Sequence, residues 1–156
     1  MQIAELQIFD SSGTNVVHDG TLSQSSTGAG RVPALAKDGI LSTYSSTTQE
    51  QGEYESSHLL FRHVPYFIKL LTLPTFLSSC FLDPYFEVTW NSSFDFMGIK
   101  IFFRIDDANL ESRWANSVIT LTAGSSSYYY NIDIAESQMY AGIEMLDIPA
   151  DIFKVC

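Results

Sequence analysis

The first candidate for chemistry is a charged cluster near position 104. Arg104 and Asp106 stand two positions apart, and Arg113 follows a few residues later. A guanidinium presents several N–H donors in a rigid fork, so it can bridge neighbouring oxygen atoms of a polar ligand. A nearby carboxylate keeps such donors aimed in fixed directions. The cluster therefore suits recognition of a polar ligand. Its alternative role is a structural ion pair between Arg104 and Asp106 at a strand end.

Aromatic residues could supply flat apolar surfaces for a ring-shaped ligand. Tyr44, Trp114 and the run Tyr128-Tyr129-Tyr130 are the candidates. Successive side chains of a strand point to opposite faces, so at least one tyrosine of the run is expected in the core. Trp90 ends an expected strand and is also assigned to the core. Trp114 directly follows Arg113, although burial is the alternative for it too.

The sequence holds no catalytic motif of the common kinds. It has no Gly-x-Ser-x-Gly elbow, no phosphate-binding glycine loop and no His-Glu-x-x-His. Glu50 with Glu53, or Asp106 with Asp107, could be read as carboxylate pairs for glycoside hydrolysis. That reaction needs two carboxyl groups facing each other across a cleft, which nearness in sequence does not supply. We therefore expect a protein that is not an enzyme.

Composition predicts one globular domain over residues 1–156. The chain is 46% hydrophobic and 17% charged, which is typical of a protein with a packed core. Its net charge of −10 disfavours nucleic acid and anionic membranes as partners, because both would repel it. Cys80 and Cys156 form neither a disulfide framework nor a metal-binding spacing.

Most of the chain is expected to form β-strands. Segments rich in β-branched and aromatic residues recur at short spacing, and they occupy 3–10, 85–90, 96–103, 117–123, 127–134 and 143–148. Residues 20–31 are rich in Gly, Ser and Thr and are expected to form a loop. Residues 33–37 are expected to form one helical turn that Pro33 starts and Gly39 closes. The pattern predicts an all-β antiparallel sandwich or jelly roll of about eight strands.

Residues 55–84 interrupt this pattern as a hydrophobic insertion. The part from 58 to 82 has no acidic residue and is rich in leucine and aromatic residues. A transmembrane helix is disfavoured because charged residues and prolines interrupt it. A hydrophobic hairpin or a buried helix remains open. A translated intron or a recent insertion fits better, because Tyr54 would join Phe86 naturally if the segment were removed.

Short segments in order resemble the discoidin-like, galactose-binding-like jelly rolls of the coagulation-factor type C superfamily, and most closely the fucose-binding lectin branch. They are IAELQIFDSSGTNV (3–16), SQSST (23–27), LAKDG (35–39), STYSS (42–46), YFEVTW (85–90), IKIFFRID (99–106) and SRWANSVITL (112–121). The resemblance implies a carbohydrate-binding module that recognises a glycan or glycoprotein through loops at one end. A protein–protein or adhesion module on the same fold, without sugar binding, is the alternative.

The resemblance also assigns site residues. Arg104 and Arg113 would contact the sugar, and Asp106 would orient them. Tyr44 or Trp114 would stack on it. A histidine of the lectin branch aligns with Ser46, so this chain departs from the family pattern there.

A structural calcium ion is common in this family. Asp38, in the turn Ala36-Lys37-Asp38-Gly39, and Glu5 resemble two of its ligands. Hard oxygen ligands in flexible loops suit Ca²⁺. Leu35 and Ile40 stand where the family has further polar ligands, so the expected set is incomplete.

The resemblance implies an extracellular or cell-surface protein. The chain starts at Met1 and continues into the first expected strand, with no signal-peptide pattern. Localisation is therefore an expectation of the family only.

Overall fold

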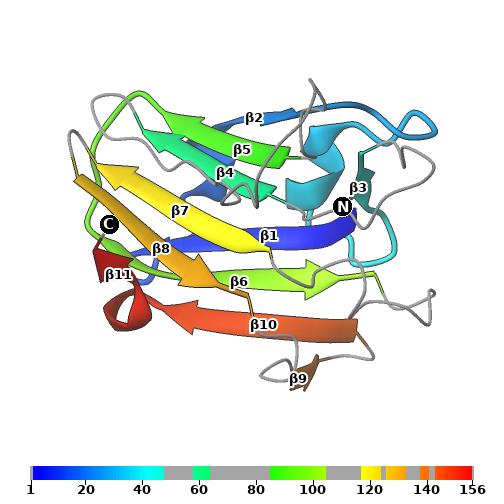
Figure 1. The fold of residues 1–156 in the computed structure, drawn as a ribbon. Helices are drawn as coiled ribbons and strands as arrows, with labels where there is room; N and C mark the ends of the chain where they lie inside the picture. The colour runs from blue at the N-terminus through cyan, green and yellow to red at the C-terminus, as the bar shows by residue number, and fades with distance from the viewer. Residues whose placement is uncertain are drawn as a thin grey trace, which may run out of the picture.

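Two β-sheets packed face to face form the protein (Figure 1). The computed structural model describes residues 2–47, 58–63, 85–104, 117–123, 126–132, 138–140 and 143–155. Within these residues the strands number eleven, of which β3, β9 and β11 have only two or three residues. The expectation of an all-β antiparallel sandwich is confirmed.

The first sheet has five antiparallel strands in the order β3-β1-β6-β10-β9. They are β1 (Gln2–Asp10), β3 (Ser45–Ser46), β6 (Phe96–Phe103), β9 (Gln138–Tyr140) and β10 (Ile143–Pro149). β1 pairs with β6 along most of its length, with one register shift between Ile3 and Glu5 and another between Phe9 and Asp10. Such bulges re-aim side chains near the end of a strand.

The second sheet has six strands in the order β11-β8-β7-β4-β5-β2. They are β2 (Thr21–Gln24), β4 (His58–His63), β5 (Tyr85–Trp90), β7 (Val118–Ala123), β8 (Ser126–Asn131) and β11 (Lys154–Val155). β4 runs parallel to both of its neighbours, whereas the other pairs in this sheet are antiparallel. β4 belongs to the predicted insertion at 55–84, whose other residues lie outside the described part of the chain.

The core fills the space between the two sheets. β5 shows the alternation that this requires, because Phe86, Val88 and Trp90 are buried and the residues between them are half-exposed. The expected core position of Trp90 is confirmed, and its indole Nε1 donates a 2.8 Å hydrogen bond to the carbonyl of Val16. The first sheet contributes mainly Ile and Leu, namely Ile3, Leu6, Ile8, Ile99, Ile101, Leu146 and Ile148.

The tyrosine run behaves as the strand period predicts. Tyr128 and Tyr130 pack against the core, while Tyr129 between them does not belong to that cluster. Their half-burial in β8 follows from its position near the edge of the sheet, beside the short strand β11.

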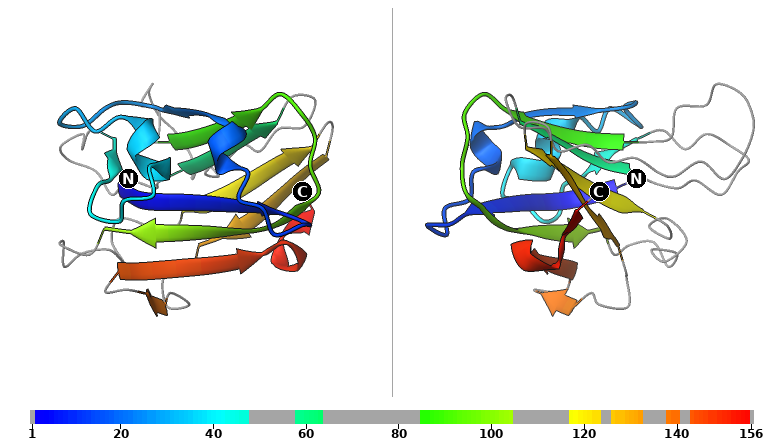
Figure 2. Two further views of the ribbon diagram at one scale, coloured as in Figure 1. Left: turned by 180° about the vertical axis from the view of Figure 1, so that it is seen from behind. Right: turned by 60° about the vertical axis from the view of Figure 1, so that its left-hand side comes forward.

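Three short 3₁₀ helices complete the described fold: η1 (Val17–Asp19), η2 (Pro33–Lys37) and η4 (Ala150–Ile152). η2 is the helical turn expected at 33–37, and Gly39 after it has a positive φ of 76°. η2 contacts β1, β2 and β3 and so connects the two sheets (Figure 2). The Lys37 ammonium fixes it by donating to the carbonyls of His18 at 3.1 Å and Gly20 at 2.7 Å.

Within the described ranges, no helix is both long enough and apolar enough to cross a lipid bilayer.

Candidate functional site

The candidate site lies at the end of the five-stranded sheet where β1 begins. Ile3 of β1 pairs with Phe103 of β6 on one side and with Ser45 of β3 on the other. Arg104 directly follows Phe103, and Tyr44 directly precedes Ser45. The strand register therefore brings Tyr44 and Arg104 to the same end of the sandwich.

Two arginines converge on the ring of Tyr44. The guanidinium carbon of Arg31 lies 3.6 Å from the ring centre, and that of Arg104 lies 4.0 Å from it. Arg104 Nη1 also donates a hydrogen bond to the Tyr44 hydroxyl. A cation near an aromatic face is attracted by the ring quadrupole, by about 0.5–2 kcal/mol depending on solvent access. Tyr44 therefore holds two cationic groups close together.

Tyr44 itself is almost covered, with 8% of its surface exposed. It packs in a small apolar cluster on the outer face of the five-stranded sheet, with Ala4, Phe102 and Met145, and with Leu41 over them. These apolar contacts fix the Tyr44 ring on the sheet, and the two guanidinium groups contact the same ring. Arg31, Arg104 and Leu41 are each half-buried, so the two arginines are the polar residues of this cluster that are partly exposed to solvent.

The backbone next to Arg31 is held by Gln24. The Gln24 amide Nε2 donates to the carbonyl of Arg31 at 3.0 Å and to the carbonyl of Ser46 at 3.1 Å. The Ser46 N–H donates to the Arg31 carbonyl at 3.2 Å, which ties the loop directly to β3. Gly28 lets the backbone of this loop come close to the backbone of Thr47, because a Cβ at position 28 would lie 2.8 Å from the Thr47 carbonyl oxygen.

Ser46, which stands where the lectin branch has a histidine, has an internal role. Its side chain is 8% exposed and its hydroxyl donates to the Thr47 carbonyl at 3.0 Å. Its backbone carbonyl accepts from Gly28 N–H and from Gln24. Ser46 therefore helps to position the loop that carries Arg31.

Three of the predicted site residues lie outside the described residues. They are Asp106, Arg113 and Trp114. Their predicted roles beside Arg104 remain predictions. Arg104 is the last described residue before them.

The two predicted metal ligands are close to each other. The Gly39 N–H donates a 3.1 Å hydrogen bond to Glu5 Oε2, so Glu5 lies directly beside the turn that carries Asp38. Glu5 and Gly39 line a cavity of about 310 Å³ on the outer face of the five-stranded sheet, and Lys100, Phe102 and Met145 line it too. Phe102 and Met145 also pack with Tyr44, so this cavity adjoins the arginine cluster.

Burial controls the charge of Glu5. Its surface is 2% exposed, and this desolvation raises the pKa of its carboxyl to about 7. The hydrogen bond from Gly39 lowers that pKa, and the nearby charge of Asp38 raises it. Glu5 therefore exchanges a proton near neutral pH.

Both carboxylate oxygens of Asp38 accept hydrogen bonds from residues of its own turn. Its Oδ1 accepts from the Ile40 N–H and its Oδ2 from the Thr43 hydroxyl, both at 2.8 Å. No group of three or more His, Cys, Asp or Glu side chains suited to one metal ion occurs in the described ranges. Calcium takes six to eight oxygen ligands, and these two carboxylates alone do not supply them. Calcium binding therefore stays a prediction of the resemblance.

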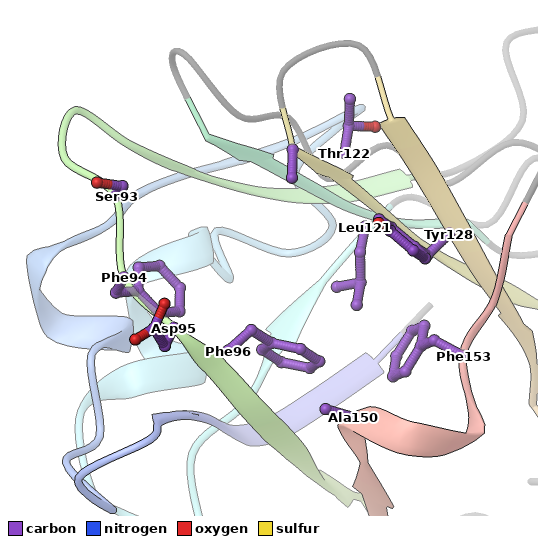
Figure 3. Close-up of a pocket in the computed structure, with 10 residues that line it drawn as sticks. Ser93, Phe94, Asp95, Phe96, Leu121, Thr122, Tyr128, Ala150 and Phe153 are labelled. Atoms are coloured by element: carbon purple, nitrogen blue, oxygen red, sulfur yellow. The ribbon is translucent and has the colours of Figure 1, made fainter.

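A second cavity lies at the other end of the sandwich (Figure 3). It has a volume of about 460 Å³, and its walls come from the start of β6, the end of β7, the start of β8 and the region after η4. Phe96 and Phe153 face each other across it, with ring centres 5.6 Å apart in an edge-on contact. Four of its ten described lining residues are aromatic and none of the ten is basic, so it differs in chemistry from the Tyr44 end.

Arg31 and Gln24 are the functional residues that sequence reasoning missed. Arg31 is the only charged residue of the Gly-, Ser- and Thr-rich segment at 20–31, which was expected to be a loop and instead begins with β2. Its isolation was the one sequence signal that pointed to a functional role, because core packing does not explain a single arginine at the end of a polar segment. Its meeting with Tyr44 depends on contacts between distant segments.

Comparisons of this chain with protein-family models, curated proteins and solved structures found no match.

Proposed function

We propose that this chain is a non-catalytic carbohydrate-binding module on a galactose-binding-like jelly roll, which recognises a glycan or glycoprotein at the Tyr44 end. The observation that carries the proposal is the convergence of Arg31 and Arg104 on one tyrosine at the end of a sheet. Guanidinium forks are suited to sugars because adjacent hydroxyls accept two parallel hydrogen bonds. The resemblance of the segment ending in Asp106 to fucose-binding lectins supports the same location.

The proposed roles follow from burial. Arg31 and Arg104 donate to the ligand, because both are half-buried and reach solvent. Tyr44 positions them, which differs from the stacking role expected from sequence, because its surface is 8% exposed. Arg113 and Trp114 keep their proposed roles as second donor and stacking surface, with Asp106 as orienting carboxylate. An extracellular or cell-surface location belongs to the same proposal.

A preformed site favours tighter and more specific recognition. Gln24 and Ser46 hold the Arg31 backbone before any ligand arrives, and Tyr44 restrains both guanidinium groups. Such preorganisation lowers the entropy cost of ordering long side chains, about 0.5–1.5 kcal/mol for each.

A glycan array tests the proposal. Purified protein is applied with calcium and again with EDTA, beside Arg104→Ala and a control, Lys154→Ala, whose side chain is exposed on β11. β11 lies at the opposite end of the molecule from β3 in Figure 1. We expect selective binding by the wild type and by the control, and loss of binding by a folded Arg104→Ala. A folded wild type that binds no glycan would favour the adhesion module.

A further inference from the structure

The second cavity, at the end of the sandwich away from Tyr44, carries an inference about a separate ligand. Its volume of about 460 Å³ is within the range of small-molecule sites in proteins, which is about 300–1,000 Å³. The aromatic residues that line it are Phe94, Phe96, Tyr128 and Phe153. All four are only half-buried, so part of their apolar surface is in contact with water. A ligand with an apolar surface would cover these rings and displace that water.

Contacts between aromatic rings fix the walls of this cavity. Phe96 and Phe153 stand nearly at right angles, with an interplanar angle of 85° and ring centres 5.6 Å apart (Figure 3). The ring centre of Tyr130 lies 5.9 Å from that of Phe153, and Phe94 contacts Trp90 edge-on at 5.1 Å. A ligand would therefore meet walls that are already in place, which lowers the entropy cost of binding.

The charges around the cavity favour a cation. Its one charged residue among the ten described lining residues is Asp95, which is exposed. Lys154 follows Phe153 in sequence, but it pairs with Tyr129 in the register of β11 with β8. Because Tyr128 packs toward the core, Tyr129 and its partner Lys154 lie on the opposite face of the sheet. The net charge of −10 on the whole chain also attracts cations.

The aromatic walls favour a cation whose charge is surrounded by carbon. A bare ammonium group has three N–H donors that need acceptors, and phenyl rings accept hydrogen bonds only weakly. An alkylated ammonium group presents methyl or methylene groups instead. It keeps the attraction between a positive charge and the face of an aromatic ring, and it also covers apolar surface. An alkylated ammonium ion therefore matches this cavity better than a bare ammonium ion or an anion does.

We propose that the second cavity binds a small organic cation that carries an alkylated ammonium group. Phe96 and Phe153 are the aromatic contacts of this cation, and Asp95 is the carboxylate that attracts its charge. Phe96 pairs with Asp10, the last residue of β1, whereas Tyr44 lies where β1 begins. The two sites are therefore separate, and the inference goes beyond carbohydrate binding and does not depend on it.

Choline and neohexanol test this inference as a matched pair. The two molecules have nearly the same shape, but a neutral carbon atom in neohexanol replaces the charged nitrogen atom of choline. Each is titrated into the wild type, and amide ¹H–¹⁵N spectra are recorded at low and at high sodium chloride concentration. We expect choline to cause saturable shifts at Phe96, Thr122 and Phe153, with an affinity about tenfold or more above that of neohexanol. High salt should weaken choline binding.

Variants assign the contributions of the carboxylate and of the ring. Asp95→Asn should lower choline affinity severalfold and leave neohexanol affinity unchanged. The matched control Asp19→Asn removes an exposed carboxylate of η1 that does not line the cavity, and it should bind both probes like the wild type. Phe96→Leu keeps an apolar side chain without a ring, so it should lose the preference for choline. Thermal unfolding checks that each variant is folded.

Equal affinity of the wild type for choline and neohexanol would overturn the inferred preference for a cation. Choline shifts confined to other parts of the protein, or no saturable shift with choline, would overturn the site itself. Glycan binding is measured on the same protein samples. Failure of choline binding beside intact glycan binding would leave the carbohydrate-binding proposal standing, so the two proposals can fail separately.

Discussion

The Arg31 guanidinium lies over the ring of Tyr44, with its carbon 3.6 Å from the centre of the phenol ring. This contact ties a loop residue that precedes η2 to the residue that precedes β3. Since Arg104 contacts the same ring from the end of β6, three separate segments meet at Tyr44. Tyr44 is therefore the centre of the proposed site.

Two variants separate the ring of Tyr44 from its hydroxyl. Tyr44→Phe keeps the ring for both guanidinium groups and removes the hydrogen bond with Arg104. We expect a loss of glycan affinity of about tenfold or more, because a hydrogen bond from a charged donor contributes roughly 1.5 kcal/mol or more. Tyr44→Ala removes both interactions and should abolish detectable binding. Titration calorimetry measures both, and equal affinity of Tyr44→Ala and wild type would contradict the positioning role.

Gln24 is expected to act on binding more than on stability. Gln24→Met removes the donors to Arg31 and Ser46, but both carbonyls keep a second donor, the Ser46 N–H and the Gly28 N–H. We expect unfolding free energy to fall by only about 1 kcal/mol, while glycan affinity falls severalfold as the Arg31 loop loosens. Urea unfolding and calorimetry measure the two. Unchanged affinity with a large loss of stability would assign Gln24 a purely structural role.

The raised pKa of Glu5 predicts that the stability of the fold depends on pH. Its pKa is raised from 4.5 to about 7 in the folded chain, so the folded state binds this proton more tightly than the unfolded state does. The contribution of Glu5 to unfolding free energy is therefore highest below pH 4.5 and is lost as pH rises to about 7. Its full size is about 3 kcal/mol, at 1.36 kcal/mol for each pKa unit.

Glu5→Gln should remove this dependence. Glutamine keeps an acceptor for the Gly39 N–H and has no charge to desolvate. We expect the variant to be more stable than the wild type at pH 8 and to lose less stability between pH 5 and pH 8. Denaturant titrations at the two pH values measure this difference. An identical pH dependence of both proteins would show that Glu5 ionises in the folded state without an energetic cost.

Calcium is expected to have little effect on stability through Glu5 and Asp38. Both Asp38 oxygens accept hydrogen bonds within the turn, and Glu5 accepts one from Gly39. Thermal unfolding at pH 7.5 should give the same midpoint in calcium and in EDTA. A calcium-dependent rise that disappears in Glu5→Gln would contradict this expectation and would restore the metal site that the family resemblance implies.

The aromatic residues at the second cavity are expected to contribute to stability and not to glycan binding. Phe153 contacts Phe96 at 5.6 Å and Tyr130 at 5.9 Å between ring centres. Phe153→Ala should lower the unfolding free energy by roughly 2 kcal/mol through lost apolar burial. Its glycan affinity should equal that of the wild type, because Phe96 and Phe153 line the second cavity, at the other end of the sandwich from Tyr44. A large loss of glycan affinity in a folded Phe153→Ala variant would place the ligand at this second cavity and would contradict a site at Tyr44.

The sequence predicted local features more fully than long-range ones. The strand period placed Trp90 in the core, and Pro33 with Gly39 predicted the turn that forms η2, because these signals act within a few residues. The parallel pairing of β4 with β5 and β7 could not be predicted, since it depends on partners distant in sequence. The role of Arg31 was missed for the same reason. Its neighbours Gln24 and Ser46 come from different strands.

The most direct test of the central claim is an amide ¹H–¹⁵N titration with the strongest ligand from the glycan array. We expect saturable shifts of the amide signals of Arg31, Ser46 and Arg104, and unchanged signals for Phe96 and Phe153 in the second cavity. Shifts confined to the second cavity, or a folded protein that shows no shift with any glycan, would contradict a carbohydrate site at Tyr44.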